Sequence, residues 1–526
     1  MSRSRAARPL EDEADFVVVG TGAGGATAAR VLAGAGHSVL LLEEGPHLSM
    51  DARPREMLPT MRDLFRDMGS TLALGPAPFP VLQGRVVGGS TAINSGIIWR
   101  LPEAIRRHWA EAWGLGEVLT EERLTEAFER IEAETHVAPT GEAVLGGNAS
   151  VLARGAAALG LEGHPTRRNA AGCQGSARCL QGCPTGAKQS MDRSYVPRAL
   201  RDGARLHALA RVERVEIRGG RAVGVTGHRL EPATRRPVAP LRIRARRGVV
   251  VSAGVVHTPL ILQHSGLKRL VGERFQAHPG TAVVARFPEP VGMGFGATQA
   301  YQVPCFERGY KIESLSLPPE MLAARLPGTG AAWQRRLAEL DHYAQWAVMC
   351  RMEAKGRIRR RLGGGPKIHY APTQRDLERL RDGIVLAARL FFAAGASEVY
   401  PWMSSRPPIL RRAEEIRYLE EGPVTHRDFH LMATHLFGTA VAGADPSRSV
   451  VGPTLESHSV GGLYVMDASV FPTNIGVNPQ HSIMGVVWCA AERLANESAV
   501  ARPLRSRRPS PARPPADRAQ RAHPSP

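Results

Sequence analysis

Four glycines and one glutamate have the types and the spacing to bind a phosphate-bearing ligand. The glycines fall within six residues of the 526-residue chain, at Gly20, Gly22, Gly24 and Gly25. Gly20 permits a tight turn, Gly22 lets the backbone approach a pyrophosphate, and Gly25 lets a helix pack close to a strand. Glu43 follows at the distance where a carboxylate accepts hydrogen bonds from ribose hydroxyls. The pattern predicts a dinucleotide-binding turn, and by itself it does not separate FAD from NAD.

Three cysteines form a second cluster of residues that could bind a metal or take part in redox chemistry. Cys173, Cys179 and Cys183 follow a C-x5-C-x3-C-P pattern in a glycine-rich loop. In a chain expected to be cytoplasmic, clustered cysteines indicate metal or redox use more than disulfides. The final Cys-Pro is typical of iron–sulfur loops. Zinc is disfavoured because no histidine or fourth cysteine lies at a zinc-finger interval. A loop with packed thiols, or with one disulfide, remains the alternative.

The elements that must hold the glycine turn are visible on either side of it. An apolar run at residues 16–19 predicts a strand, residues 26–35 predict a helix, and a second apolar run at 38–42 predicts a strand that ends beside Glu43. The start of such a helix offers free N–H groups and a positive dipole end to phosphates. This order predicts a Rossmann-like unit.

Four further segments favour FAD through a family resemblance. Residues 84–100 (GRVVGGSTAINSGIIWR) and 252–266 (SAGVVHTPLILQHSG) resemble the two signatures of the glucose–methanol–choline (GMC) flavoprotein oxidoreductases. Residues 435–439 (HLFGT) resemble the segment with the family's active-site histidine, and residues 467–479 (DASVFPTNIGVNP) resemble its C-terminal flavin-binding segment. The segments occur in the family's order. The resemblance implies FAD as the cofactor and disfavours a nicotinamide dehydrogenase.

The resemblance implies a set of FAD contacts beyond the glycine turn. Asn94 is expected at the flavin edge and Val212 near the adenine. Ile93 stands where some members carry a histidine bonded to the flavin, and because isoleucine cannot form that bond, non-covalent FAD is implied. The implied contacts are Gly88, Gly89, Ser90, Asn94, Val212, Ala253, Asp467, Asn478 and Pro479.

The resemblance also implies the catalytic residues of an alcohol-oxidising enzyme. His435 and Asn478 are expected to converge over the flavin ring. A neutral histidine suits a base that takes the hydroxyl proton as hydride leaves carbon for flavin N5. Asn478 can donate a hydrogen bond to the developing alkoxide. His481 is the rival candidate, although we expect it to begin the last helix and to face the pyrimidine or solvent.

The substrate and the electron acceptor are less defined. The chain is most similar to the cholesterol-oxidase-like and long-chain alcohol oxidase branches, which favours an apolar or cyclic alcohol. The cysteine spacing resembles that of FAD-dependent glucose dehydrogenase catalytic subunits, which implies a [3Fe–4S] cluster and electron exit to a quinone or cytochrome. Long-chain alcohol oxidases carry a similar stretch for which no cluster is implied. An oxidase that uses oxygen and a non-redox flavoprotein lyase remain alternatives.

The predicted fold class is α/β (α+β overall): a Rossmann-like FAD-binding domain with an inserted substrate domain, a sheet roofed by helices. Both domains are discontinuous. The predicted divisions are a disordered N-terminus at 1–11, an FAD-binding domain at 12–137, 200–287 and 443–500, a Cys-rich connection at 138–199, a substrate domain at 288–442, and a disordered basic tail at 501–526.

Charge and hydropathy restrict the partners. The net charge is +19, but residues 501–526 carry seven Arg against one Asp and the remaining excess is scattered, so we expect no nucleic-acid partner. No stretch reaches the roughly 18 uninterrupted apolar residues of a membrane span, and no secretion signal is visible. We therefore expect a cytoplasmic enzyme without a membrane span.

Overall fold

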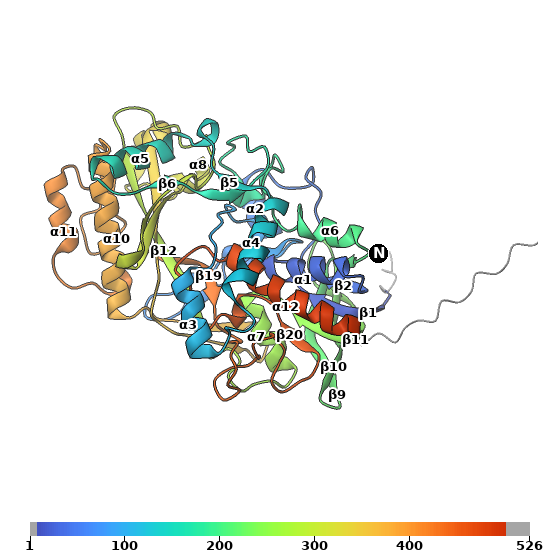
Figure 1. The fold of residues 1–526 in the computed structure, drawn as a ribbon. Helices are drawn as coiled ribbons and strands as arrows, with labels where there is room; N and C mark the ends of the chain where they lie inside the picture. Colours follow the sequence, from blue (N-terminus) through green and yellow to red (C-terminus); the bar gives the residue numbers. More distant parts are fainter. Residues whose placement is uncertain (1–7, 501–526) are drawn as a thin grey trace, which may run out of the picture.

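The computed structural model describes residues 8–500, with side chains as far as residue 497. Two lobes are visible in Figure 1: one holds β1, β2 and β11 beneath α1 and α12, and the other holds β12 beside α10. The fold is mixed α/β, as predicted. Strand β1 begins at Leu10, so the predicted N-terminal tail is two residues too long. The predicted basic tail lies outside the described residues.

The first lobe is built on a seven-stranded sheet. Its order is β8-β2-β1-β11-β10-β9, with β20 beside β11. Residues 16–19 of β1 are buried and run parallel to both β2 and β11, as their apolar character requires. The strands are β1 (Leu10–Val19), β2 (Val39–Leu42), β8 (Arg205–His207), β9 (Ala210–Arg218), β10 (Arg221–Leu230), β11 (Pro237–Val251) and β20 (Leu463–Val465).

Helix α1 (Ala23–Gly34) connects β1 to β2 and confirms the predicted strand–turn–helix–strand unit. It packs against α12 (Gln480–Val500) and α6 (Tyr195–Arg201). Its glycines let α1 approach the sheet closely: an added Cβ at Gly24 would lie 1.9 Å from the carbonyl oxygen of Met466, the residue that follows β20. The close packing places the start of α1 at the carboxyl end of β1, where open α/β sheets bind ligands.

The second lobe also contains a seven-stranded sheet. Its order is β18-β12-β15-β14-β13-β6, with β19 beside β12. Helix α10 (Gln374–Ala393) packs on this sheet, and its start is fixed by a capping box between Thr373 and Asp376. The strands are β6 (His164–Pro165), β12 (Gln276–Arg286), β13 (Tyr301–Cys305), β14 (Tyr310–Ser314), β15 (Tyr343–Cys350), β18 (Glu398–Tyr400) and β19 (Met432–Phe437).

Several strands cross the predicted domain divisions. Strand β12 lies in the second sheet, although residues 276–287 were predicted to belong to the FAD-binding domain. A four-stranded sheet joins β3 (Leu72–Leu74) and β4 (Phe79–Pro80) to β16 (Arg357–Arg360) and β17 (Pro366–His369). Strand pairing between distant segments leaves no local pattern in the sequence, so these divisions could not be located from it.

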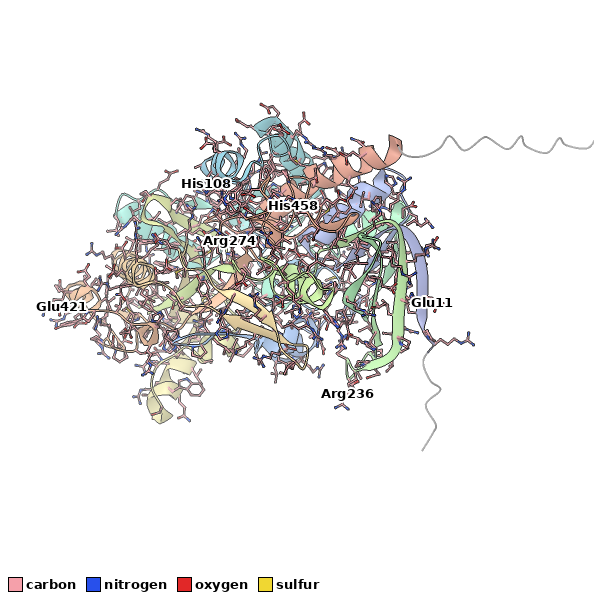
Figure 2. All side chains as sticks on the ribbon, turned by 90° about the horizontal axis from the view of Figure 1, so that it is seen from below. Glu11, His108, Arg236, Arg274, Glu421 and His458 are labelled. Carbon is pink, nitrogen blue, oxygen red and sulfur yellow. The ribbon has the colours of Figure 1, made fainter. Side chains whose placement is uncertain are left out.

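The remaining elements cover the two sheets and connect them. None of the helices within residues 8–500 combines the length and apolar character that crossing a bilayer needs. Figure 2 shows Glu421 at one end of the molecule and Glu11 and Arg236 at the other. These elements are α2 (Met57–Leu64), α3 (Glu103–Trp113), α4 (Glu121–Glu134), α5 (Gly147–Ala158), α7 (Gly254–His264), α8 (Pro319–Ala323), α9 (Gly330–Ala338), α11 (Arg417–Glu420), β5 (Val137–Pro139) and β7 (Arg167–Asn169).

Candidate active site

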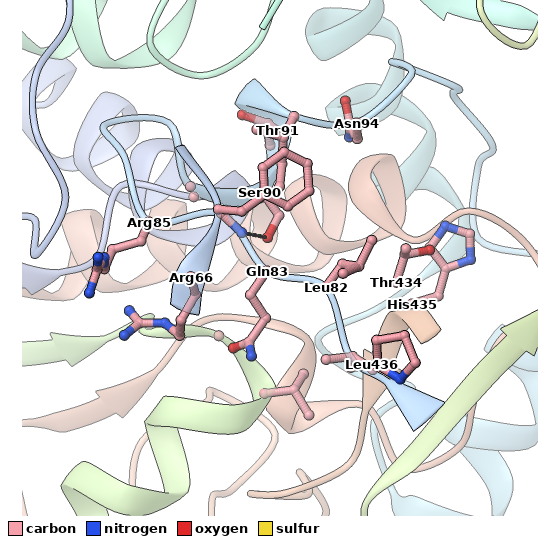
Figure 3. Close-up of a pocket in the computed structure, with 18 of the residues that line it drawn as sticks. Arg66, Leu82, Gln83, Arg85, Ser90, Thr91, Asn94, Thr434, His435 and Leu436 are labelled. Carbon is pink, nitrogen blue, oxygen red and sulfur yellow. Dashed lines mark hydrogen bonds between the residues drawn. The ribbon is translucent and has the colours of Figure 1, made fainter. Parts of the chain in front are cut away.

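A cavity of roughly 1110 Å³ is lined by residues of both lobes. Figure 3 shows Arg66 and Arg85 toward one end of this part of the cavity and Asn94 and His435 toward the other, with Gln83 between them. Most of the predicted site residues line it: Gly20, Gly22, Gly24, Glu43, Gly89, Ser90, Asn94, Val212, Ala253, Asp467, Asn478, Pro479 and His435. The fold therefore brings together segments that are more than 400 residues apart.

The glycine turn has the geometry that phosphate binding requires. Gly20 has a φ of +98°, and a Cβ there would lie 2.2 Å from the carbonyl oxygen of Ser252. Gly22, at the start of α1, would direct a Cβ into open space. Gly25 does not line the cavity, because it packs against the carbonyl of Gly20. The N–H groups of the first turn of α1 are thus available to an anion in the cavity.

The ribose-binding candidate is fixed by its neighbours. Glu43 is buried at the end of β2 and accepts hydrogen bonds from the Thr21 hydroxyl (2.7 Å), the Thr21 N–H (3.1 Å) and the Gly45 N–H (2.8 Å). Burial raises its pKa, while these donors lower it. Gly88 donates its N–H to the same Thr21 hydroxyl (2.9 Å). Gly88 therefore supports the cavity wall from behind and does not line it.

A second loop, residues 88–94, closes the cavity opposite the glycine turn. A Cβ at Gly89 would lie 2.9 Å from the Cα of Gly22, so the two glycines face each other. Asn94 donates its side-chain N–H to Gln480 Oε1 (2.7 Å). On the far side, Asp467 accepts from the Gly254 N–H (2.9 Å), and burial raises its pKa. The predicted FAD contacts thus come from seven separate segments of the chain.

Several buried polar atoms on the cavity wall have no partner in the protein. A buried polar group without a hydrogen bond costs about 1–3 kcal/mol, so such atoms normally meet a ligand or water. Their number fits a ligand with many polar atoms along its length, as FAD has. They are Gln83 Nε2, Ser95 Oγ, His278 Nδ1, Thr281 Oγ1, Trp402 Nε1 and Gln480 Nε2.

His435 and Asn478 lie side by side, and a buried lysine sets their arrangement. The ammonium group of Lys311 donates to Asn478 Oδ1 and to Glu313 Oε1 (2.6 Å). Because an ammonium group can only donate, Asn478 must turn its oxygen toward Lys311 and its N–H groups away from it. Asn478 Nδ2 lies 3.5 Å from His435 Nε2. Asn478 therefore presents a donor on the histidine side.

His435 is uncharged at neutral pH. Burial and the positive charge of Lys311 lower its pKa to about 3. Its Nδ1 lies 3.0 Å from the sulfur of Met349, an acceptor, while its Nε2 faces the donor of Asn478. These partners assign the proton to Nδ1 and the lone pair to Nε2. The arrangement can accept a proton at Nε2 and can stabilise a developing negative charge at Asn478 Nδ2.

The chain matches known proteins along most of its length. The N-terminal profile of the GMC oxidoreductases matches residues 15–280 and the C-terminal profile matches residues 353–486. An uncharacterized GMC-type oxidoreductase of Mycobacterium tuberculosis, Rv0492c, is 36% identical over 490 residues, covering 92% of this chain and 76% of the relative. The chain belongs to the GMC oxidoreductase family. The family resemblance in the sequence is thereby confirmed.

Other relatives of this GMC oxidoreductase are more distant. Long-chain-alcohol oxidase FAO4B of Arabidopsis thaliana is 27% identical over 514 residues, covering 92% of this chain and 67% of the relative. Among solved structures, a formate oxidase of Aspergillus oryzae RIB40 has a TM-score of 0.72 at 17% identity, covering 93% of this chain and 99% of the other. Pyridoxine 4-oxidase from Mesorbium loti has a TM-score of 0.67 at 17% identity, covering 93% and 100%. At such identities the structures show a shared fold, and family membership implies FAD.

Three residues of the site were not predicted from the sequence. His278 lies in β12 opposite His435 in β19, and the two rings are 5.7 Å apart. Lys311 and Glu313 form the buried ion pair behind Asn478. No motif surrounds any of the three. The only sequence signal is the alternation of Lys311 and Glu313, which places both side chains on one face of β14.

His481 begins the last helix as expected, but it faces neither solvent nor the cavity. Its side chain is fully buried, does not line the cavity, and lies 3.1 Å from Glu132 Oε1 in α4 through its Nε2. Burial lowers the pKa of His481, although Glu132 opposes that shift. Since His481 is the second residue of α12, its direction depends on how that helix packs on α4. In this GMC oxidoreductase His481 joins two helices.

The prediction of an iron–sulfur site at the cysteines is not supported. Across residues 8–500, no group of three or more His, Cys, Asp or Glu is arranged to hold a metal ion. The guanidinium group of Arg168 donates to the sulfurs of Cys179 (3.2 Å) and Cys173 (3.6 Å), and the sulfur of Cys183 accepts from the Lys188 N–H (3.3 Å). A cationic side chain therefore contacts two of the thiols.

The cysteine loop instead supports the second loop of the cavity, residues 88–94. Lys188 is fully buried, and its ammonium group donates to the carbonyl oxygens of Ala92 and Cys179 (3.0 Å each) and to that of Asn94. Burial lowers its pKa to about 8. The lysine connects the two loops and restrains the backbone at Asn94.

Proposed function

We propose that this GMC oxidoreductase uses non-covalently bound FAD to oxidise the CH–OH group of an alcohol. One observation carries the proposal: a neutral His435, with its lone pair at Nε2, lies beside the oriented amide of Asn478 on the wall of the cavity that also contains the glycine turn. A base and a hydrogen-bond donor are the two groups that alcohol oxidation asks of a protein.

The two side chains divide the chemistry. FAD, when bound, would supply the oxidant that accepts a hydride, which is two electrons and one proton, from the carbinol carbon. His435 Nε2 accepts the hydroxyl proton. Asn478 Nδ2 donates a hydrogen bond to the oxygen as negative charge develops there, and Lys311 holds the amide in that orientation. Lys311 therefore acts through Asn478, as a positioning residue.

The cavity wall supports an apolar alcohol as the substrate. The lining includes several aliphatic and aromatic side chains, among them Leu82, Leu180, Leu315, Leu317, Met321 and Phe429. Apolar lining with few polar groups is typical of sites for largely hydrocarbon ligands. Relatives named long-chain-alcohol oxidases agree with this substrate class.

Ile93 supports non-covalent binding of the flavin. Its aliphatic side chain lines the cavity and offers no nucleophile for a bond to the flavin. Acid precipitation of purified yellow protein tests this point: the flavin should appear in the supernatant. Flavin that stays with the pellet would contradict it.

The function is tested by flavin reduction without oxygen. Purified, FAD-loaded protein is mixed anaerobically with a panel of alcohols, and absorbance of the flavin is followed. We expect bleaching by long-chain primary alcohols. Reoxidation by oxygen would mark an oxidase, and reoxidation only by a quinone or a cytochrome would mark a dehydrogenase. Turnover of the substrate without any bleaching would overturn the proposal in favour of a non-redox flavoprotein.

A further inference from the structure

One half-buried arginine on the cavity wall has no acidic partner. Of the other arginines that line the cavity, Arg66 and Arg85 lie near Glu44, Arg211 pairs with Glu213, and Arg360, which forms no salt bridge among the described residues, is exposed. Arg325 lines the same cavity and is half-buried. Within residues 8–500 no salt bridge or side-chain hydrogen bond joins its guanidinium group to another residue.

Local structure directs Arg325 into the cavity. It follows α8 in a turn in which its N–H donates to the carbonyl of Leu322 (2.8 Å). Met321 and Arg325, four residues apart, both line the cavity, as one helical face would. Leu322 and Leu326 instead belong to the buried core of the second lobe. Because these two leucines pack in the core, the other face of the turn, with Met321 and Arg325, lines the cavity.

The surroundings make an unpaired charge there costly. Burial lowers the pKa of Arg325, and no carboxylate offsets that effect. Leu322 and Leu326, on either side of it in the chain, belong to an apolar cluster against which Trp402 packs, and Met321 lines the same cavity. A guanidinium group in such a setting is satisfied best by an anion that it can bind with two parallel hydrogen bonds, and a carboxylate has that geometry.

The position of Arg325 in the chain relates it to the reacting end of the site. The wall segment starts at Glu313, the partner of Lys311 beside Asn478, and continues through Leu315 and Leu317, which both line the cavity. Arg325 comes twelve residues after Glu313, beyond this apolar stretch. Both ends of this segment, Glu313 and Arg325, and the two leucines between them thus line one cavity.

We propose that Arg325 binds the carboxylate of a substrate that carries its reacting hydroxyl at the other end of an apolar chain, so that the substrate class is a hydroxy acid with a hydrocarbon body. This rests on the proposed alcohol oxidation and narrows its substrate. The single positive charge matches a carboxylate monoanion. The carboxylate binds Arg325, the apolar body lies along the leucine-lined wall, and the hydroxyl group reaches His435 and Asn478.

Three compounds that differ only at one end test the proposal. Anaerobic flavin reduction is measured with 12-hydroxydodecanoate, its methyl ester and dodecan-1-ol. We expect the lowest half-saturating concentration for the hydroxy acid. Because a hydrogen-bonded charge is lost, Arg325→Gln should raise that concentration by about 10- to 100-fold for the hydroxy acid and leave the ester within about twofold. Arg335→Gln, an exposed arginine on the neighbouring α9, is the matched control and should change neither.

A binding measurement tests the carboxylate site independently of the proposed alcohol oxidation. Dodecanoate has no hydroxyl group, and calorimetry should show that it binds the FAD-loaded wild type and binds Arg325→Gln about 10- to 100-fold more weakly. If no alcohol bleaches the flavin but dodecanoate binding depends on Arg325, the oxidation is wrong and the carboxylate site stands. If Arg325→Gln affects acid and ester alike, or if dodecanoate binds both proteins equally, Arg325 simply extends toward solvent and the proposal is overturned.

Discussion

Replacing Lys311 with methionine tests whether this buried lysine orients Asn478 and neutralises Glu313. The lysine side chain is 0% exposed, and that of its partner Glu313 is 3% exposed. The substitution keeps the length and apolar stem of the side chain but removes its charge and its hydrogen bond to Asn478. It should therefore change stability and catalysis for two separable reasons.

The stability effect comes from Glu313. Breaking a buried ion pair by removing one partner costs about 3–5 kcal/mol, because the other charge is left uncompensated. Glu313 keeps one donor, the side-chain N–H of Gln299 (3.0 Å), which places Lys311→Met at the lower end of that range. The double variant with Glu313→Gln removes both charges and should recover most of the loss.

The catalytic effect comes from Asn478 and should persist in both variants. A lost donor to a developing oxyanion costs about 2.7–4 kcal/mol. Asn478 still contacts His435 after the change, so the loss should be smaller, and flavin reduction should slow by about 10- to 100-fold. Lys268→Met, at an exposed lysine, is the control and should leave the rate unchanged.

The pH dependence of flavin reduction tests the effect of the Lys311 charge on His435 independently. His435 must be neutral to accept a proton, so reduction should fall only when the pH approaches its pKa, about 3 in the wild type. Burial is the larger cause of that low pKa and Lys311 the smaller. Without the lysine charge, the acidic limb should move to higher pH and still remain below the usual 6.5 of histidine.

Stopped-flow reduction between pH 3 and 9, together with denaturant unfolding, measures both effects. A double variant that reduces its flavin at the wild-type rate with an unshifted acidic limb would refute the positioning role of Lys311. A double variant that is as unstable as Lys311→Met would refute the assignment of the stability loss to Glu313.

Four more predictions follow from the same geometry. His435→Ala should slow flavin reduction by about 10²–10⁴-fold while FAD stays bound; near-normal reduction in rapid kinetics would rule out His435 as the base. Asn478→Ala should lose about 2–4 kcal/mol of transition-state stabilisation, and a change confined to substrate affinity would contradict this. His481→Ala should lower the free energy of unfolding by about 1–3 kcal/mol, through its lost contact with α4, with little effect on reduction; the opposite pattern would return His481 to the active site. Gly22→Val should be folded by circular dichroism but colourless by absorbance, because the valine side chain would enter the space for the phosphates. Gly24→Ala should instead fail to fold well, since its Cβ would overlap a carbonyl oxygen. Equal FAD content in both would contradict the role of the turn.

Features that depend on neighbours in the chain were readable from the sequence. The apolar runs around the glycine turn predict β1, α1 and β2 because side-chain periodicity and turn geometry act over a few residues. Helix α1 was predicted at residues 26–35 and occupies Ala23–Gly34. The HLFGT and NP segments predicted His435 and Asn478, which the fold brings within 3.5 Å of each other. Because each of these motifs is a continuous stretch of the chain, it can be recognised from the sequence without knowledge of the fold.

Features that depend on which surfaces meet were decided only by the tertiary structure. Lys311 reaches Asn478 across 167 positions, and His278 lies opposite His435 through the pairing of β12 with β19. Arg168 enters the cysteine loop and contacts two of its thiols. Burial sets the electrostatics of each of these groups, because a charge or a lone pair in a low-dielectric interior depends on the few atoms around it. Those atoms come from distant segments, and no spacing in the sequence records them.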